Sequence, residues 1–447
     1  MTTARPDVGL PEPRVVPWVL ALARLVSWPY LRLGLGFERV TVSHGDILVD
    51  AFKDALDGRR RVILAFRHPY GDEPQLLSWL FAGGISREAR RLGVRTARKP
   101  HAVFVHGYEV PRWGGALVRW ILPRVGAMPV HHSKLDSSGM ARIRAAIEDG
   151  TYPVALSPEG QVSYTSDGVP RLEPGVVRLG FQAADRLASA GRAEHVHILP
   201  VSVHYHYGEC ARSGLARLTA RLERFVGLPC AAWVPAGTPG GIGARLGDVL
   251  EVILTNVERQ YGLSPTPDGK TATRVEAVVE AALSAGERIL GIARTSGDRF
   301  ARLYRIRQIG WDRVYLPSDE DPRGMSPMAR AVADRRAGEA WYGMRHMELA
   351  DFALYLRSGP PADDAPLRML VEYAQNLWDF ANRLAGGTIS GRVEVRPKQA
   401  VIIVGQPLDL CDRLAAFRAD RKKATVDALM ELEESYQHCI KENIDEN

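Results

Sequence analysis

Cysteine and long apolar runs are scarce in this chain of 447 residues, and each scarcity excludes a class of protein. The four cysteines are scattered without the spacing of metal ligands, which argues against a disulfide framework and predicts reduced thiols in a cytosolic setting. No basic run is interleaved with aromatic residues, so we expect no nucleic-acid partner. The sequence shows no internal repeat and no secretory signal.

The overall composition is that of a globular protein, with 46% hydrophobic and 25% charged residues. The length allows two domains, or one large domain with an insertion. A net charge of +6 and an isoelectric point near 9.1 favour an anionic partner. Acidic membrane surfaces, phosphorylated substrates and coenzyme A all meet that description.

The N-terminal segment, residues 1–37, is predicted to contact a membrane. Residues 1–14 are polar and rich in proline, which predicts disorder. Residues 15–35 are strongly apolar, but two arginines and a proline interrupt the roughly 20 apolar residues that a spanning helix needs. A helix lying in the interface tolerates such cations and places Trp and Tyr at headgroup depth. We therefore expect a peripheral or monotopic contact with the cytoplasmic face of a membrane. The alternative is a helix packed on the protein's own core.

Strands and helices alternate over residues 38–207, which predicts an α/β core with a central mixed sheet flanked by helices. The expected strands are 38–48, 62–66, 103–105, 126–130, 154–156 and 196–203. The expected helices are 73–81, 114–123, 138–149 and 175–190, with 50–57 a short helix or turn.

The pattern becomes mainly helical over residues 208–390, a long insertion before the last strand of the sheet. Its expected helices are 248–261, 271–294, 327–337 and 365–385. We expect this insertion to interrupt the α/β domain rather than to form an independent one, and it is too long for a plain loop. Residues 391–447 then return with strands at 391–396 and 399–408 and a final amphipathic helix at 414–441.

One buried strand, residues 62–66, leads directly into a loop that carries His68, Asp72 and Glu73. The Pro and Gly between them predict a tight turn, after which a helix begins. A histidine with a carboxylate four or five residues away suits the deprotonation of an alcohol. The alternative is a loop histidine beside acids that favour a helix N-terminus.

Three later blocks accompany this loop, and together with it they resemble the glycerolipid acyltransferase family of the lysophosphatidic acid acyltransferase type. That family carries H-x4-D, G-x-x-F-I-x-R, P-E-G-T-R-S and V-P-V blocks. His68 and Glu73 take the first two conserved positions, with Glu in place of Asp. The other blocks correspond to residues 126–132, 158–163 and 199–201, so the resemblance covers about residues 60–207.

The resemblance implies transfer of a fatty acyl group from an acyl thioester, acyl-CoA or acyl-ACP, to a hydroxyl of a lysophospholipid or glycerolipid in the membrane. His68 is the expected general base, Glu73 its carboxylate partner and Asp72 the reserve partner. Backbone N–H groups around Glu159 and Gly160 are expected to stabilise the oxyanion, with Glu159 organising its loop. The expected substrate-binding residues are Gly126, His132, Lys134, Pro158, Glu159, Gly160 and Arg178. No metal and no cofactor beyond the acyl co-substrate are expected.

The acceptor is less defined, because two arginines that are thought to hold the acceptor's phosphate in the family are replaced here by His132 and Val162. Lys134 and Arg178 are nearby in sequence. Two other functions therefore stay open: acyl transfer to a non-glycerolipid alcohol or amine, and a catalytically inactive lipid-binding relative. The basic stretch 87–99 is a solvated face or a phosphate contact.

Overall fold

The computed structural model describes residues 2–131, 136–230, 241–264, 269–293, 298–317, 319–388 and 391–445. The chain forms two compact units, each described here by itself. The sheet unit contains residues 10–206 and 398–447, and the helical unit contains residues 1–9 and 207–397.

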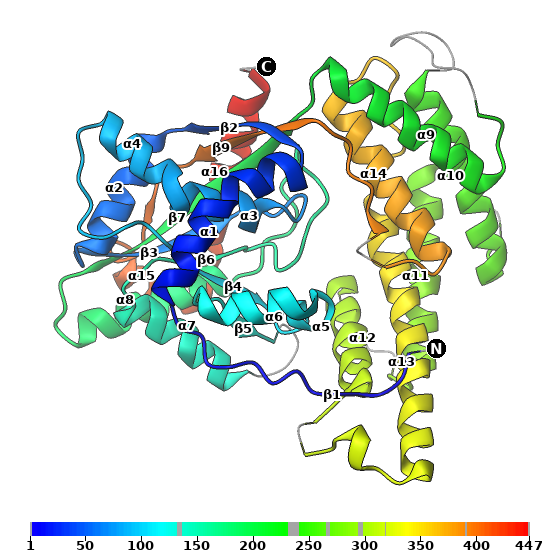
Figure 1. The fold of residues 1–447 in the computed structure, drawn as a ribbon, viewed down its shortest axis with the longest axis horizontal. Helices are drawn as coiled ribbons and strands as arrows, with labels where there is room; N and C mark the ends of the chain where they lie inside the picture. Colours follow the sequence, from blue (N-terminus) through cyan, green and yellow to red (C-terminus); the bar gives the residue numbers. More distant parts are fainter. Residues whose placement is uncertain are drawn as a thin grey trace. The chain divides into compact units, whose positions relative to one another are not determined.

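The sheet unit is built on a mixed sheet that has eight strands within the described residues (Figure 1). The strand order is β2-β9-β7-β3-β6-β4-β5, and β10 pairs with the start of β7. The strands are β2 (Phe37–Ser43), β3 (Arg60–Phe66), β4 (Val103–Gly107), β5 (Met128–Val130), β6 (Val154–Leu156), β7 (His195–His206), β9 (Lys398–Val404) and β10 (Leu408–Asp409). This arrangement confirms the expected α/β class with a central mixed sheet flanked by helices.

Strand direction decides which loops can meet. The strands β7, β3, β6, β4 and β5 run parallel to one another, whereas β9 is antiparallel to β7 and parallel to β2. The centre of β3, residues 62–66, is buried throughout, as the continuous apolar run of a parallel strand covered on both faces requires. The carboxyl ends of five strands therefore share one edge, where ligands bind in many open α/β sheets.

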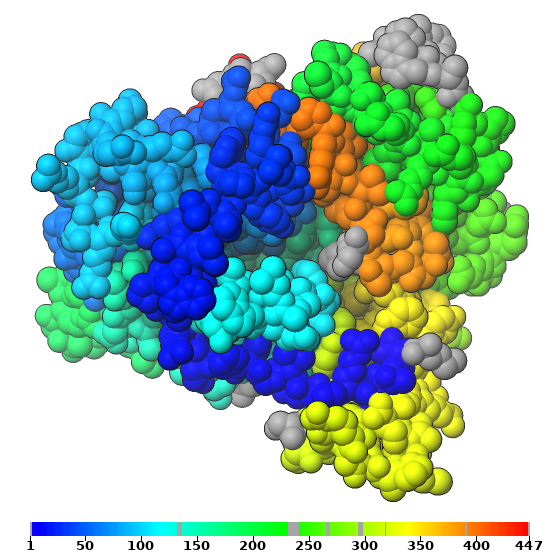
Figure 2. All heavy atoms as spheres, in the orientation of Figure 1, coloured from blue at the N-terminus to red at the C-terminus, as the bar shows by residue number. Residues whose placement is uncertain are grey.

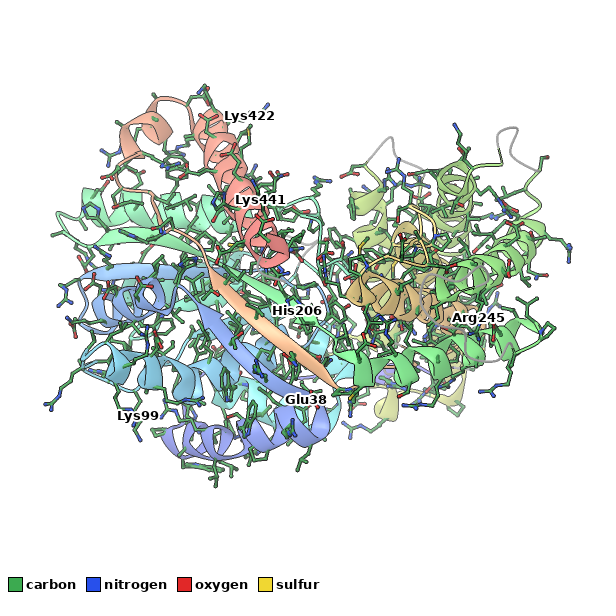
Figure 3. The ribbon with its side chains drawn as sticks, turned by 90° about the horizontal axis from the view of Figure 1, so that it is seen from above. Glu38, Lys99, His206, Arg245, Lys422 and Lys441 are labelled. Atoms are coloured by element: carbon green, nitrogen blue, oxygen red, sulfur yellow. The ribbon has the colours of Figure 1, made fainter. Side chains whose placement is uncertain are left out.

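Helices cover both faces of the sheet. The helical segments of this unit are α1 (Pro17–Pro29), η1 (Tyr30–Gly34), α2 (Gly45–Leu56), α3 (Glu73–Trp79), η2 (Leu80–Gly84), α4 (Ile85–Arg91), α5 (Val110–Trp113), α6 (Gly115–Arg124), α7 (Ser137–Asp149), α8 (Gly175–Ser189), α15 (Leu414–Ala419) and α16 (Arg421–Asp445). One core cluster joins α7, α8, α15 and α16 to the sheet, for example through Phe181, Leu432 and Ile198. Figure 3 shows α16 and α1 on opposite sides of the sheet.

Three local expectations for the strands and the final helix are wrong. Residues 45–48 begin α2 instead of continuing a strand, since their apolar side chains follow helical spacing and pack into the core. The expected strand 391–396 does not form, and the return to the sheet begins at Lys398 with β9. The final helix is divided at Asp420, where α15 ends in extended backbone.

The helical unit contains three helices close to the expected ones, a fourth, Pro327–Leu354, that is much longer than the expected 327–337, and two that the sequence analysis missed. Its helical segments are η3 (Glu209–Ala211), α9 (Arg212–Val226), α10 (Ile242–Tyr261), α11 (Thr271–Ile289), α12 (Arg299–Val314), η4 (Pro322–Gly324), α13 (Pro327–Leu354) and α14 (Leu367–Leu384). The missed helices are α9 and α12, which are rich in arginine. These helices pack on one another, so residues 207–397 together with residues 1–9 form a compact unit.

The N-terminal residues are ordered, contrary to the predicted disorder. Strand β1 (Arg5–Pro6) pairs in parallel with β8 (Tyr315–Leu316), and the backbone N–H of Ala4 donates to Asp334 Oδ1 at 2.9 Å. Hydrogen bonds to β8 and α13 thus help to offset the conformational entropy that this proline-rich segment loses when it becomes ordered. Within the described ranges, no helix joins enough length to enough apolar character to cross a bilayer.

Candidate active site

His68 lies just beyond the carboxyl end of β3, in the loop that leads into α3. Its ring nitrogen Nδ1 lies 2.5 Å from Glu73 Oε2. The Glu73 side chain is fully buried, while 19% of the His68 side chain is exposed. The pairing through Nδ1 leaves Nε2 as the ring nitrogen that can exchange a proton with a substrate, which is the arrangement of a base with an orienting carboxylate.

Glu73 is held in this position by the loop and by a neighbouring strand. The backbone N–H groups of Tyr70 and Gly71 donate to its carboxylate at 3.0 and 2.9 Å. Gly71 has a φ of 99°, a conformation that side chains disfavour, so the turn favours glycine there. The hydroxyl of Tyr205 on β7 donates to the other carboxylate oxygen, Oε1. Buried hydrogen bonds to both oxygens fix the carboxylate before any substrate binds.

The contact between His68 and Glu73 shifts the pKa of both side chains. Burial disfavours a charge on His68, but the hydrogen bond and negative charge of Glu73 outweigh it and raise the pKa of the imidazole above its usual value. Burial likewise disfavours a charge on Glu73, but hydrogen bonds from His68 and Tyr205 outweigh it and lower the pKa of that carboxyl. The pair therefore favours imidazolium and carboxylate, and stabilises the proton that a general base accepts.

Glu159 connects the Pro-Glu-Gly turn to the histidine loop. Its Oε2 accepts the backbone N–H of His68 at 3.0 Å, and its Oε1 accepts Nε of Arg67 at 3.2 Å. Arg67 is fully buried and also donates to the carbonyl oxygens of residues 165, 166 and 168. The backbone N–H of Ser163 donates to the His68 carbonyl at 2.9 Å. Glu159 and Arg67 thus link the Pro-Glu-Gly turn to the histidine loop through buried hydrogen bonds.

The oxyanion role expected of this turn is not met in the observed conformation. The backbone N–H of Glu159 donates to Ser157 Oγ at 3.2 Å, and that of Gly160 to the Ser157 carbonyl at 3.3 Å. Both groups are thus used within the turn itself, since Gly160 has a φ of 72° that closes it. Pro158 is buried, and its carbonyl accepts the Glu173 N–H at 2.6 Å. The hydrogen bonds of Pro158, Glu159 and Gly160 therefore stabilise the conformation of the Pro-Glu-Gly turn.

Asp72, the alternative carboxylate partner expected for His68, pairs instead with Lys398. Its Oδ2 pairs with Nζ of Lys398, a fully buried side chain at the start of β9. The ammonium also lies 4.8 Å from the centre of the Phe37 ring. Asp72 therefore neutralises a buried lysine, and Glu73 alone of the two acids bonds to the imidazole. The contact also fastens the returning strand to the histidine loop.

The other expected substrate-binding residues are not gathered at this loop. Gly126 precedes β5 and so lies toward the amino end of the parallel strands, the edge away from His68. A side chain at Gly126 would meet Val103 and Val15 at 2.9 Å, which explains the glycine by packing. Arg178 is exposed on the second turn of α8. His132 and Lys134 lie outside the described residues.

Three buried residues of the site were missed from the sequence: Arg67, Tyr205 and Lys398. Of the three, only Arg67 could have been found from the local sequence, because a charged residue at the end of a buried apolar strand needs a partner.

A second polar group lies at the carboxyl ends of β4 and β5, where the rings of Tyr108 and His131 stack with their centres 4.1 Å apart. Arg112 lies 4.9 Å from the Tyr108 ring centre.

On β7, His206 hydrogen bonds to Asn443 through a contact of 2.7 Å, and His204 is buried on the same strand. The basic stretch 87–99 is largely exposed, in agreement with a solvated face.

Comparison with known families and proteins adds no assignment. No protein-family model matches the chain. No characterised protein matches it significantly in sequence.

Proposed function

We propose that the chain is an acyltransferase that moves a fatty acyl group from acyl-CoA or acyl-ACP to the hydroxyl of a lysophospholipid or glycerolipid. The observation that carries the proposal is the His68–Glu73 contact of 2.5 Å at the carboxyl edge of the sheet, joined by Glu159 to the Pro-Glu-Gly turn. The blocks that resemble glycerolipid acyltransferases fall on β3, β5, β6 and β7 and the loops after them.

In the proposed reaction, His68 Nε2 takes the proton of the acceptor hydroxyl as its oxygen attacks the thioester carbonyl. Glu73 holds the ring and balances the charge of the imidazolium. The tetrahedral intermediate then collapses, the carbon–sulfur bond breaks, and the departing thiolate receives the proton. The products are an ester and a free thiol, and the imidazole is neutral again.

The proposal is tested with the purified full chain, radiolabelled acyl-CoA or acyl-ACP, and a panel of lysophosphatidic acid, other lysophospholipids, lipid alcohols and lipid amines. Labelled diacyl product from a lysophospholipid supports it. Transfer only to an amine or a non-glycerolipid alcohol would mean that this compound class, and not a lysophospholipid or glycerolipid, is the acceptor. The absence of transfer from either donor to every acceptor contradicts the proposal and favours a lipid-binding protein without turnover.

The rate of transfer is expected to rise with pH through a midpoint above about 6.5, the usual pKa of histidine. The base must be neutral, and Glu73 raises the pKa of the imidazole, so the active fraction is lost at a higher pH than for an isolated histidine. Glu73→Gln is expected to move this acid limb to lower pH. The measurement is kcat/KM across mildly acidic to mildly alkaline pH, and an unmoved limb in the variant contradicts the assignment.

A lipid substrate requires a membrane contact, and we propose that an exposed apolar surface on α1, η1, α5 and α6 provides it. Trp18 of α1 and Trp120 of α6 have ring centres 5.8 Å apart, and Figure 2 shows the two helices side by side on one face. The surface consists of Trp18, Leu22, Leu25, Val26, Trp28, Tyr30, Leu33, Trp113, Leu117 and Trp120. Arg32 and Arg119 are exposed on the same helices and suit anionic headgroups.

The double variant Leu25→Asp and Leu33→Asp is expected to weaken vesicle binding more than about tenfold, because each leucine that enters the interface contributes roughly 1.5–3 kcal/mol. These side chains are 74% and 81% exposed, so the fold should tolerate the change. Cosedimentation with anionic phospholipid vesicles measures it. Met430→Asp on α16, on the other side of the sheet, is the matched control, and equal binding by both variants argues against this surface.

A further inference from the structure

A cluster of three potential metal ligands lies apart from His68, at the amino end of β7. His195 and His197 are two residues apart on this strand, so their side chains share one face. Asp409 on β10 is the register partner of His197. Its Oδ2 lies 2.6 Å from His195 Nδ1 and 3.1 Å from His197 Nε2.

The geometry is close to that of a tetrahedral ion site. The three ligand atoms lie within 4.8 Å of one another. Bonds of about 2.0–2.2 Å to Zn²⁺ place tetrahedral ligands about 3.3–3.6 Å apart, so modest side-chain rotations convert the His195–Asp409 hydrogen bond and the 3.1 Å His197–Asp409 contact into coordination bonds. The paired strands fix the backbone under all three residues.

The surroundings of the cluster support coordination. The other carboxylate oxygen of Asp409, Oδ1, accepts the backbone N–H of Cys411 at 2.8 Å, which aims Oδ2 at the two rings. The His195 side chain is 50% exposed, whereas His197 is 11% exposed. An ion can therefore enter from solvent beside His195 and keep water as its fourth ligand, while His197 holds it from the interior.

Two cations that act on this cluster, Arg60 and Arg413, have acidic partners of their own. Arg60, level with His195 on β3, pairs with Asp54 at 3.1 Å. Arg413, close to Asp409 in sequence, donates to Glu431 at 2.7 Å. Their charges are thus partly neutralised, which lowers the repulsion that a divalent ion would meet.

We propose that His195, His197 and Asp409 form a binding site for a divalent transition-metal ion, with Zn²⁺ the best match to two imidazoles, a carboxylate and water. The site is independent of the proposed acyl transfer. His195 is level with Arg60, and β3 runs six residues from Arg60 to Phe66 before the loop with His68 begins, so the two places are about 20 Å or more apart.

Bound metal would fasten the C-terminal segment to the sheet. Strand β10 has only two residues and leads into α15 and α16. The latter helix packs against β7, and the hydroxyl of its Tyr436 donates to the Ala65 carbonyl at 2.8 Å. An ion held by β7 and β10 together would strengthen the start of this segment, as ligands stabilise the state that binds them.

The test uses the full chain, freed of metal with a chelator and titrated with Zn²⁺. One equivalent is expected to bind and to raise the melting temperature. His195→Ala and Asp409→Asn are each expected to lower the affinity at least about tenfold. His438→Ala, a change at an exposed histidine on α16, should leave it unchanged. His197→Gln is a third variant, checked for folding by circular dichroism because this side chain is buried.

Titration with Co²⁺ separates this site from the exposed thiols of Cys210 and Cys230. The d–d bands of a four-coordinate ion without a thiolate charge-transfer band support the His–His–Asp site. A thiolate band, or an affinity for Zn²⁺ that the His195 and Asp409 variants do not change, overturns the proposal. So does a metal-free chain that binds no Zn²⁺ at all.

Discussion

His68→Ala is expected to lower the rate of acyl transfer by about 10²–10⁴-fold, because the variant lacks the group that takes the acceptor's proton. The variant should still fold, since the ring is partly exposed and Glu73 stays bonded to Tyr205, Tyr70 and Gly71, but its unfolding midpoint should fall because the buried carboxylate loses its charged partner. The measurement is single-turnover transfer to the best acceptor, with circular dichroism and melting curves for both proteins.

Two comparisons make the result specific to His68. His438→Ala removes an exposed histidine from α16 and should leave transfer unchanged. Glu73→Gln keeps the shape of the partner but removes its charge, and it should reduce kcat more than it raises KM, because the carboxylate matters most when the imidazolium forms. Full activity in the His68 variant would contradict the assignment of the base.

Glu159→Ala is expected to destabilise the sheet unit by about 3–5 kcal/mol, because it leaves the guanidinium of Arg67 as an uncompensated charge in the core. Both side chains are buried, and their contact of 3.2 Å is closed to solvent. The backbone N–H of His68 loses its acceptor as well, so the histidine loop should become mobile and the activity should fall with the stability. Urea unfolding followed by circular dichroism measures the loss.

The control for this change is Asp427→Ala, which removes an exposed partner of Lys423 on α16 and should leave the free energy of unfolding nearly unchanged. The double variant Arg67→Met with Glu159→Gln tests the pairing itself. It should be more stable than the sum of the two single changes predicts, by about 0.5–3 kcal/mol, since removing both charges leaves neither unpaired. Additive losses would mean that the two side chains act separately.

The sequence predicted the α/β class, the strand that ends at His68 and the return of the chain to the sheet. These features depend on local patterns: a continuous apolar run predicts a buried strand, and alternation with amphipathic helices predicts parallel neighbours. The same patterns predicted that residues 45–48 continue a strand and that residues 1–14 are disordered. Packing put residues 45–48 in a helix, and pairing with distant residues ordered residues 5–6.

The sequence by itself determined that His68 has an acid within reach, because only four residues, which form a tight turn, separate it from Glu73. It could not determine whether Asp72 or Glu73 pairs with the imidazole of His68. Tertiary structure decided that, by placing Lys398 against Asp72 across 326 positions and Tyr205 against Glu73 across 132. It also brought Asp409 to His195 and His197. The physical reason is that strand order selects which distant side chains become neighbours, and buried charges then pair with whatever that order supplies.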